Sequence, residues 1–204
     1  MTTQNKKNLT LLIIAATLLA GFCLWVALKP PAFDADVLSV LASHQSAWAD
    51  AVFRTTTWMG SLFVLLPLVL MGIYVLMQLG LRSDALFTAV SFTVVVALTQ
   101  ALKHLIARPR PGIQEHLAET TSVYAFPSSH VSQATAFALL AYLVIARLQP
   151  AWRLRAGVLL VVLVIVVTIS RLYLQVHYPL DVLAGILTAL VAIQACALVM
   201  EKKR

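Results

Sequence analysis

Three short polar clusters interrupt a sequence that is otherwise strongly apolar, and each contains residue types that can bind or transfer phosphate. The first is K-H-L-I-A-R-P-R-P at residues 103–111, the second is F-P-S-S-H at residues 126–130, and the third is S-R-L-Y-L-Q-V-H-Y-P-L-D at residues 170–181. Long apolar runs adjoin all three clusters, so each is expected at the end of a helix. Brought to one end of a helical bundle, these residues could form a single site.

The cations in these clusters indicate an anion site. A charged side chain deep in a bilayer costs about 2.5–3.5 kcal/mol on insertion scales, so it usually faces a polar cavity. Lys103, Arg110 and Arg171 could converge on a dense anion, because arginine makes bidentate contacts with phosphate and lysine supplies a point charge. The alternative for a lone cation is extension toward the lipid headgroups, and this is the expectation for Arg108.

Ser128, Ser129 and His130 stand where the fourth long helix is expected to begin. Two interpretations fit this position. A proline followed by serine is an ordinary signal for the start of a helix. The free backbone N–H groups of a first helical turn also bind phosphate well, and serine hydroxyls would add donors.

His177 and Asp181 are four residues apart, with Pro179 between them. Proline is preferred at the first position of a helix, which puts Asp181 near the third, where a carboxylate interacts favourably with the helix dipole. From there it could reach back to His177, fix the tautomer and leave the other nitrogen free as a nucleophile or base. A helix-capping aspartate beside an interfacial histidine is the alternative.

Six apolar segments are long enough to position these clusters as membrane-spanning helices, which need about 20 residues each. They cover residues 9–28, 60–80, 84–106, 130–148, 154–174 and 180–200. The less apolar stretch 29–57 has the spacing of short amphipathic helices at the interface, which act either as a lid that guides substrate or only as an anchor. The expected fold class is therefore an all-α membrane protein with a bundle of six transmembrane helices.

The composition is that of an integral membrane protein of one domain, residues 1–204. Of these residues 61% are hydrophobic and 11% are charged, whereas soluble domains are about half apolar and about a quarter charged. The net charge of +7 is attributed to loop cations and anionic headgroups, so no nucleic-acid partner is expected. Cys23 and Cys196 lie in apolar runs and are interpreted as small hydrophobic side chains.

The distribution of lysine and arginine predicts the orientation in the membrane. With the N-terminus inside, the inner segments hold nine of these residues, including Lys202, Lys203 and Arg204, and the outer segments hold six. Because cytoplasmic loops carry the excess, both termini are expected in the cytoplasm. All three polar clusters then lie at the outer interface.

The order and internal spacing of the clusters closely resemble the three-part signature of the type-2 phosphatidic acid phosphatase superfamily. The pattern reads K-x6-R-P from Lys103 to Pro111, P-S-S-H at residues 127–130, and S-R-x5-H-x3-D at residues 170–181. The six-helix layout also resembles the membrane branch of that family. Ser129 departs from the pattern, which usually has glycine there. Serine would be strained at a positive φ and harmless in a first helical turn, and the second case is expected.

The resemblance implies a metal-independent phosphatase that works through a phosphohistidine. His177 would attack phosphorus, Asp181 would orient it, and His130 would protonate the leaving oxygen and later activate water. The other members of the signature would hold the phosphoryl oxygens: Lys103, Arg110, Ser128, Ser129 and Arg171. No metal or other cofactor is expected, since the outer acidic residues near the clusters, Glu115, Glu119 and Asp181, do not form a carboxylate cluster.

The resemblance also implies a lipid phosphate as substrate and a place in a bacterial inner membrane, with the site facing the periplasm. Undecaprenyl pyrophosphate is the first expectation, because the short chain looks like the small bacterial members that recycle this carrier. Phosphatidylglycerophosphate comes next, and a lipid A phosphatase or a lipid-to-lipid phosphotransferase third. A non-enzymatic anion-binding membrane protein is the contrasting class, with Ser129 as its only support. The sequence indicates no oligomeric state.

Overall fold

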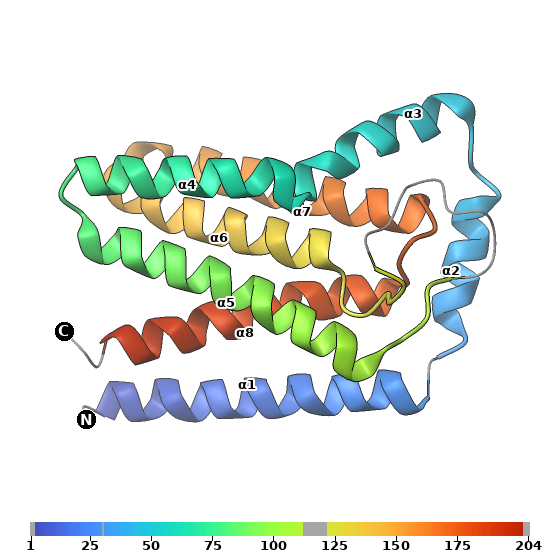
Figure 1. The fold of residues 1–204 in the computed structure, drawn as a ribbon, viewed down its shortest axis with the longest axis horizontal. Coiled ribbons are helices and arrows are strands. Elements are labelled where there is room, and N and C mark those ends of the chain that lie inside the picture. The colour runs from blue at the N-terminus through green and yellow to red at the C-terminus, as the bar shows by residue number, and fades with distance from the viewer. Residues whose placement is uncertain (1–2, 30, 112–121, 202–204) are drawn as a thin grey trace.

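Long helices running side by side form the body of the protein in the computed structural model (Figure 1), which describes residues 3–29, 31–111 and 122–201. The long helices are α1 Thr3–Leu28, α4 Leu62–Gln78, α5 Arg82–Ile106, α6 Ser129–Leu148, α7 Arg153–Tyr173 and α8 Pro179–Glu201. Each belongs to an apolar span of at least 20 residues. Within the described residues there are thus six candidate membrane-spanning segments, and the all-helical prediction is confirmed.

Short helices fill the stretch between the first two spans. They are α2 Phe33–Ala42 and α3 Ala47–Thr56, and a 3-10 turn, η1 Thr57–Gly60, leads into α4. A second 3-10 turn, η2 Pro150–Trp152, precedes α7. Figure 1 shows α2 standing across one end of the bundle, while both chain termini lie near the other end. The expected short helices between residues 29 and 57 are confirmed, and α2 covers the end where the polar clusters lie.

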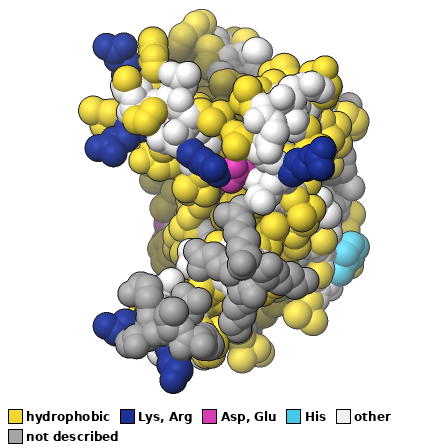
Figure 2. All heavy atoms as spheres, turned by 90° about the vertical axis from the view of Figure 1, so that its left-hand side faces the viewer, with side chains coloured by type: hydrophobic (Ala, Val, Ile, Leu, Met, Phe, Trp, Pro, Cys, Tyr) yellow, Lys and Arg dark blue, Asp and Glu magenta, His cyan; other side chains and the backbone are white. Residues whose placement is uncertain are grey.

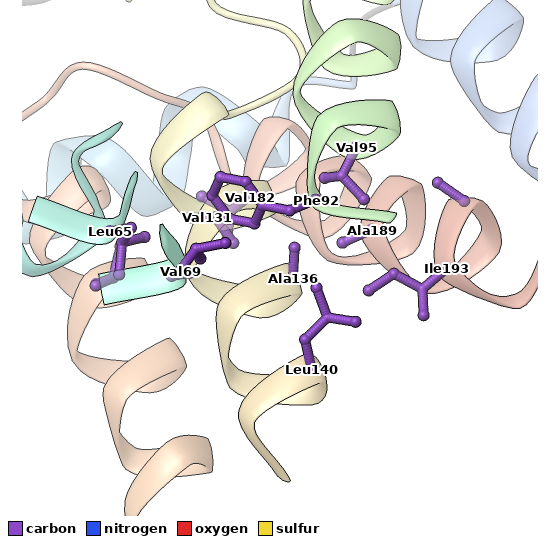
Figure 3. Packing of buried hydrophobic residues seen from close by; sticks show 13 residues of the cluster. Leu65, Val69, Phe92, Val95, Val131, Ala136, Leu140, Val182, Ala189 and Ile193 are labelled. Atoms are coloured by element: carbon purple, nitrogen blue, oxygen red, sulfur yellow. The ribbon is translucent and has the colours of Figure 1, made fainter. Parts of the chain in front are cut away.

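Helix α6 lies at the centre of the bundle and packs against α4, α5, α7 and α8. Figure 3 shows the apolar core around it, in which Val131, Ala136 and Leu140 of α6 meet Phe92 of α5 and Ile193 of α8. In a membrane, helices associate mainly through close packing, and small side chains at the contact permit it. The alanines along α6 therefore let its neighbours approach closely.

Gly185 fixes the distance between α8 and the first turn of α6. A Cβ atom at this position would lie 2.8 Å from the carbonyl oxygen of Ser128 and 3.2 Å from the amide nitrogen of Ser132. The amide of Ser128 in turn donates a hydrogen bond to the carbonyl oxygen of Asp181 at 2.9 Å. The N-terminal ends of α6 and α8 are thus joined directly, which brings the second and third polar clusters together.

Basic side chains gather at the end of the bundle opposite to α2. Figure 2 looks onto that end and shows lysine and arginine side chains spread over it. The exposed cations at the helix ends on this side are Lys6, Lys7, Arg82, Arg147, Arg153 and Arg155. Lys202, Lys203 and Arg204, which the orientation prediction also used, lie outside the described residues.

Candidate active site

The three polar clusters meet at the end of the bundle that α2 crosses. Lys103, at the last turn of α5, donates hydrogen bonds from Nζ to the carbonyl oxygens of Tyr124 at 2.9 Å and Pro127 at 3.1 Å. The Nη1 of Arg110 donates to the carbonyl oxygen of Val176 at 2.6 Å and lies 3.5 Å from Nε2 of His177. The first cluster therefore contacts both of the others, as the sequence predicts.

His177 lies in the turn between α7 and α8 and is only 2% exposed. Burial lowers the pKa of this imidazole well below its usual value, and the charges of Arg171, Arg110 and Lys103 lower it further. The ring is therefore neutral at neutral pH. A neutral imidazole has a free lone pair on one nitrogen, as a nucleophile requires.

Asp181 lies beside His177 but does not form a hydrogen bond with it. Its Oδ2 is 3.6 Å from Nδ1 of His177 and accepts a hydrogen bond from the amide of Tyr178 at 2.8 Å. Because α8 begins at Pro179, Asp181 is the third residue of the helix, as predicted. At 3.6 Å the carboxylate acts on the imidazole through its charge, and a small movement of either side chain would close the hydrogen bond.

Arg110 and Arg171 approach His177 from two different elements. The pKa of Arg110 is lowered to about 10 by burial, an effect that the charge of Asp181 partly offsets, so the side chain stays charged at neutral pH. Arg171, near the end of α7, donates from Nη1 to the hydroxyl of Thr57 at 2.7 Å. Its Nε is buried and has no hydrogen-bond partner among the described residues. Together with Lys103, both arginines lie close enough to His177 to act on its imidazole electrostatically.

Ser128, Ser129 and His130 form the entrance to α6. Ser128 occupies the capping position, yet its hydroxyl makes no capping hydrogen bond and is buried without a partner in the described part of the chain. Ser129 is the first residue of the helix, and the non-glycine residues with positive φ among those described are Ala107 and Gln175. Ser129 is therefore free of the backbone strain that a glycine position could have imposed.

His130 is half-buried on the first turn of α6. The three charges that act on it are those of Arg171, Arg110 and Lys103, the same that act on His177. The two histidines also interact with each other. Both imidazoles therefore lie in the field of the same three cations.

The prediction that Arg108 extends to the lipid headgroups was wrong. Arg108 is buried, and it donates from Nη1 to Oδ1 of Asp181 and from Nη2 to Oδ2 of Asp34, each at 2.7 Å. A buried guanidinium needs such partners, since an unpaired charge is costly away from water. Asp34 was missed as well, because an aspartate at the start of an amphipathic helix looks the same in the sequence whether it faces water or the site.

Among the described residues, no group of three or more histidines, cysteines, aspartates or glutamates is arranged to hold a metal ion. Glu115 and Glu119 lie outside the described residues. The side chains that face the pocket are mainly cations and neutral donors, which suit an anion rather than a metal ion.

Comparisons with known proteins agree on one family. The model of the PAP2 superfamily matches residues 84–204. The chain is 28% identical over 148 residues to YbjG of Escherichia coli (strain K12), which is provisionally named an undecaprenyl-diphosphatase, and 69% of each chain is covered. It is 29% identical over 144 residues to phosphatidylglycerophosphatase B of Bacillus subtilis (strain 168), with 68% of each covered.

The fold is also similar to that of a solved structure. A crystal structure of a transmembrane PAP2-type phosphatidylglycerolphosphate phosphatase from Bacillus subtilis superposes with a TM-score of 0.79 and 23% sequence identity. The match covers 95% of this chain and 97% of the other. Helix order and packing are thus shared over nearly the whole length of both proteins.

Proposed function

The chain belongs to the PAP2 superfamily, and from this premise we propose that it releases phosphate from undecaprenyl pyrophosphate through a phosphohistidine. The observation that carries the proposal is the charge balance around His177. Lys103, Arg110 and Arg171 all act on this imidazole, whereas the carboxylate of Asp181 is paired with a fourth cation. The pocket has an excess of positive charge, and phosphate is the anion that arginine forks and a lysine bind well.

In the first step, Nε2 of His177 attacks phosphorus, and the bond from phosphorus to the leaving oxygen breaks. Nε2 is the nucleophile because it faces Arg110 at 3.5 Å, whereas Nδ1 faces the carboxylate of Asp181 at 3.6 Å. His130 gives a proton to the leaving oxygen, which departs as undecaprenyl phosphate. Asp181 stabilises the positive charge that the imidazole of His177 acquires.

In the second step, water attacks the phosphohistidine. His130, now without its proton, accepts one from the water, the bond between nitrogen and phosphorus breaks, and inorganic phosphate leaves. Charge on the phosphoryl oxygens in both transition states requires fixed donors. Buried donors without a protein partner, Nε of Arg171 and the hydroxyl of Ser128, supply two of them.

The remaining donors come from Lys103, Arg110 and Ser129. The ammonium group of Lys103 has three N–H bonds and donates two of them to backbone carbonyl oxygens. The third can donate to a phosphoryl oxygen. These side chains provide the positive charge that a metal ion supplies in many other phosphatases. The reaction is therefore proposed to need no metal, and activity is expected to survive a chelator.

An apolar groove between α6 and α7 supports a lipid substrate. Its volume is about 460 Å³, and its walls include Ala138 and Tyr142 of α6 and Leu160 and Val164 of α7. Helix α6 begins at the pocket and α7 ends there, so the groove lies along two helices that meet at the headgroup site. A hydrocarbon tail can lie along it while the phosphate remains at the interface.

The pocket is proposed to face the periplasm from a bacterial inner membrane, with both termini in the cytoplasm. Six exposed cations lie at the end that carries the termini, as Figure 2 illustrates. At the other end the exposed lysine and arginine among the described residues are Lys29 and Arg54. The other described cations at that end, Lys103, Arg108, Arg110 and Arg171, are buried or half-buried. The difference in surface charge supports this orientation by the positive-inside rule. Residues 1–204 are proposed to act as one domain, because α1 packs on α8 through Cys23 and Ala184.

The deciding experiment is phosphate release by the purified protein from undecaprenyl pyrophosphate in detergent with EDTA present. A His177→Ala variant is measured beside it. Turnover by the parent and none by the variant is the expected result. No release from any lipid phosphate would overturn the proposal and favour an anion-binding protein without enzymatic activity.

Phosphatidylglycerophosphate is the second candidate substrate. The similarity to phosphatidylglycerophosphatase B, at 29% identity, favours it specifically. The rates of phosphate release from equal molar amounts of the two lipids, each in the same kind of micelle, decide between them. Faster release from phosphatidylglycerophosphate would replace the first choice of substrate and leave the proposed chemistry intact.

A further inference from the structure

A buried ion-pair network lies behind His177, and none of the proposed chemical steps uses its outer member. Arg108 joins Asp181 of α8 to Asp34 of α2, with both contacts at 2.7 Å. We infer that Asp34 is a positioning residue for the reaction, an inference that rests on the proposed function. Through Arg108 it keeps the carboxylate of Asp181 in place for its action on His177.

The charge balance of the network is the first argument. Arg108 alone would neutralise Asp181 and leave little negative charge for the imidazole of His177. Asp34 contacts the other side of the same guanidinium, so the three buried groups together carry one net negative charge. That charge lies next to a ring that becomes positive when it is phosphorylated, and at 3.6 Å, away from water, the attraction is strong.

The backbone contacts of the network are the second argument. Oδ1 of Asp34 accepts a hydrogen bond from the amide of Leu180 at 3.1 Å, and Oδ2 of Asp181 accepts one from the amide of Tyr178 at 2.8 Å. The Tyr178 ring lies against the guanidinium of Arg108, with 4.1 Å from Cζ to the ring centroid. The turn that carries the nucleophile is thus held by side chains from α2 and from the segment after α5.

Stability alone does not account for such a network. Asp34 is 1% exposed, Arg108 is 6% exposed and Asp181 is fully buried. Desolvation offsets most of the attraction in buried ion pairs, which apolar residues of similar size often replace without loss of stability. A role in placing charge at the pocket explains why three ionised groups stand where apolar side chains would suffice.

The test compares Asp34→Asn with Asp36→Asn in the purified full-length protein. Both aspartates lie in the first turn of α2, but Asp36 is exposed to solvent. Asparagine keeps the shape of Asp34 and its acceptor for the Leu180 amide while removing the charge. In Asp34→Asn we expect kcat for undecaprenyl pyrophosphate to fall by about 10- to 100-fold, by analogy with residues that orient the ligands of metal sites. KM should change by less than about threefold. Asp36→Asn should match the parent.

A binding measurement separates positioning from simple damage to the fold. Inorganic phosphate should raise the thermal unfolding temperature of Asp34→Asn as much as that of the parent, because the cations of the pocket are untouched. Loss of this stabilisation together with the loss of activity would mean that the pocket has collapsed, and would overturn the inference. Equal kcat in Asp34→Asn and Asp36→Asn would also overturn it.

The double variant Asp34→Asn, Arg108→Gln gives an independent readout. If Asp34 acts through Arg108, the double variant should lose no more activity than the more damaged single variant, while losses that multiply would refute the linkage. An inactive parent protein would overturn the proposed function and this inference together. An active parent with an unaffected Asp34→Asn variant would overturn the inference alone.

Discussion

Replacement of Gly185 by alanine is expected to destabilise the protein and slow phosphate release together. The added Cβ atom would lie 2.8 Å from the Ser128 carbonyl oxygen and 3.2 Å from the Ser132 amide nitrogen. Both are backbone atoms of the first turn of α6, so no side-chain rotation relieves the overlap. The two helices must separate, or the turn must deform.

The size of the effect follows from these distances. Ordinary contacts begin at 3.4 Å, so bringing the 2.8 Å separation to that value requires a shift of about 0.6 Å. Overpacking of this kind costs about 1–3 kcal/mol, or roughly 2–4 °C in Tm per kcal/mol for a chain of this length. The shift also moves Ser128, and since a misplacement of about 1 Å can slow a reaction about 100-fold, kcat should fall by about tenfold.

Gly72→Ala is the matched control, because Gly72 also lies within a long helix and has nothing within 4 Å of the position a Cβ would take. Alanine is the better helix former, so this variant should unfold no earlier than the parent and keep its activity. Thermal unfolding and phosphate release are measured for both variants in the same detergent. If Gly185→Ala behaves like Gly72→Ala in both assays, the close contact between α6 and α8 does not determine the geometry of the site.

Three further substitutions test other contacts by thermal unfolding. Ala107 follows the last residue of α5 and has a φ of 49°, a conformation that is costly for any residue with a Cβ atom. Ala107→Gly should therefore stabilise the protein by up to about 1 kcal/mol. A lower Tm for this variant would contradict the prediction. Thr57→Val removes the acceptor of Arg171 Nη1 and leaves a buried charged donor unpaired, which should cost about 1–3 kcal/mol without phosphate; an unchanged Tm would show that the guanidinium finds another partner. Because the pKa of His177 is lowered in the folded protein, the unfolded chain binds the proton first, and stability should fall as pH drops below about 6.5. His177→Asn should reduce the slope of unfolding free energy against pH by up to about 1.4 kcal/mol per pH unit. Equal slopes in the parent and the variant would refute the attribution of this pH dependence to His177.

Much of the fold could be predicted from the sequence because the membrane imposes simple rules. A spanning segment must be apolar over about 20 residues and must satisfy its own backbone hydrogen bonds, so apolar length alone predicts helices. The start of α8 could be predicted as well, since Pro179 and Asp181 fit the first and third positions of a helix. These are local features that depend on few distant contacts.

The parts of the site that the sequence did not reveal depend on distant partners. Arg108 is 73 residues from Asp181 and 74 from Asp34. A cation at a helix end looks the same in the sequence whether it faces lipid headgroups or a buried carboxylate. Ser128 shows a similar limit. Capping preferences describe the isolated helix, whereas here the buried hydroxyl has no partner among the described residues, and α8 packs against the same turn of α6.

The hydrogen bond between Asp34 and the amide of Leu180 joins residues 146 positions apart, which has a consequence for the protein during its synthesis. The chain is made from its N-terminus. Asp34, which follows the first span, is therefore made long before its partner Leu180 in the last span. Until α8 is in place, the nascent chain holds Arg108 without the carboxylate of Asp181. A partly inserted protein is therefore expected to be inert toward the lipid phosphates around it, and hydrolysis begins only once the last helix has entered the membrane.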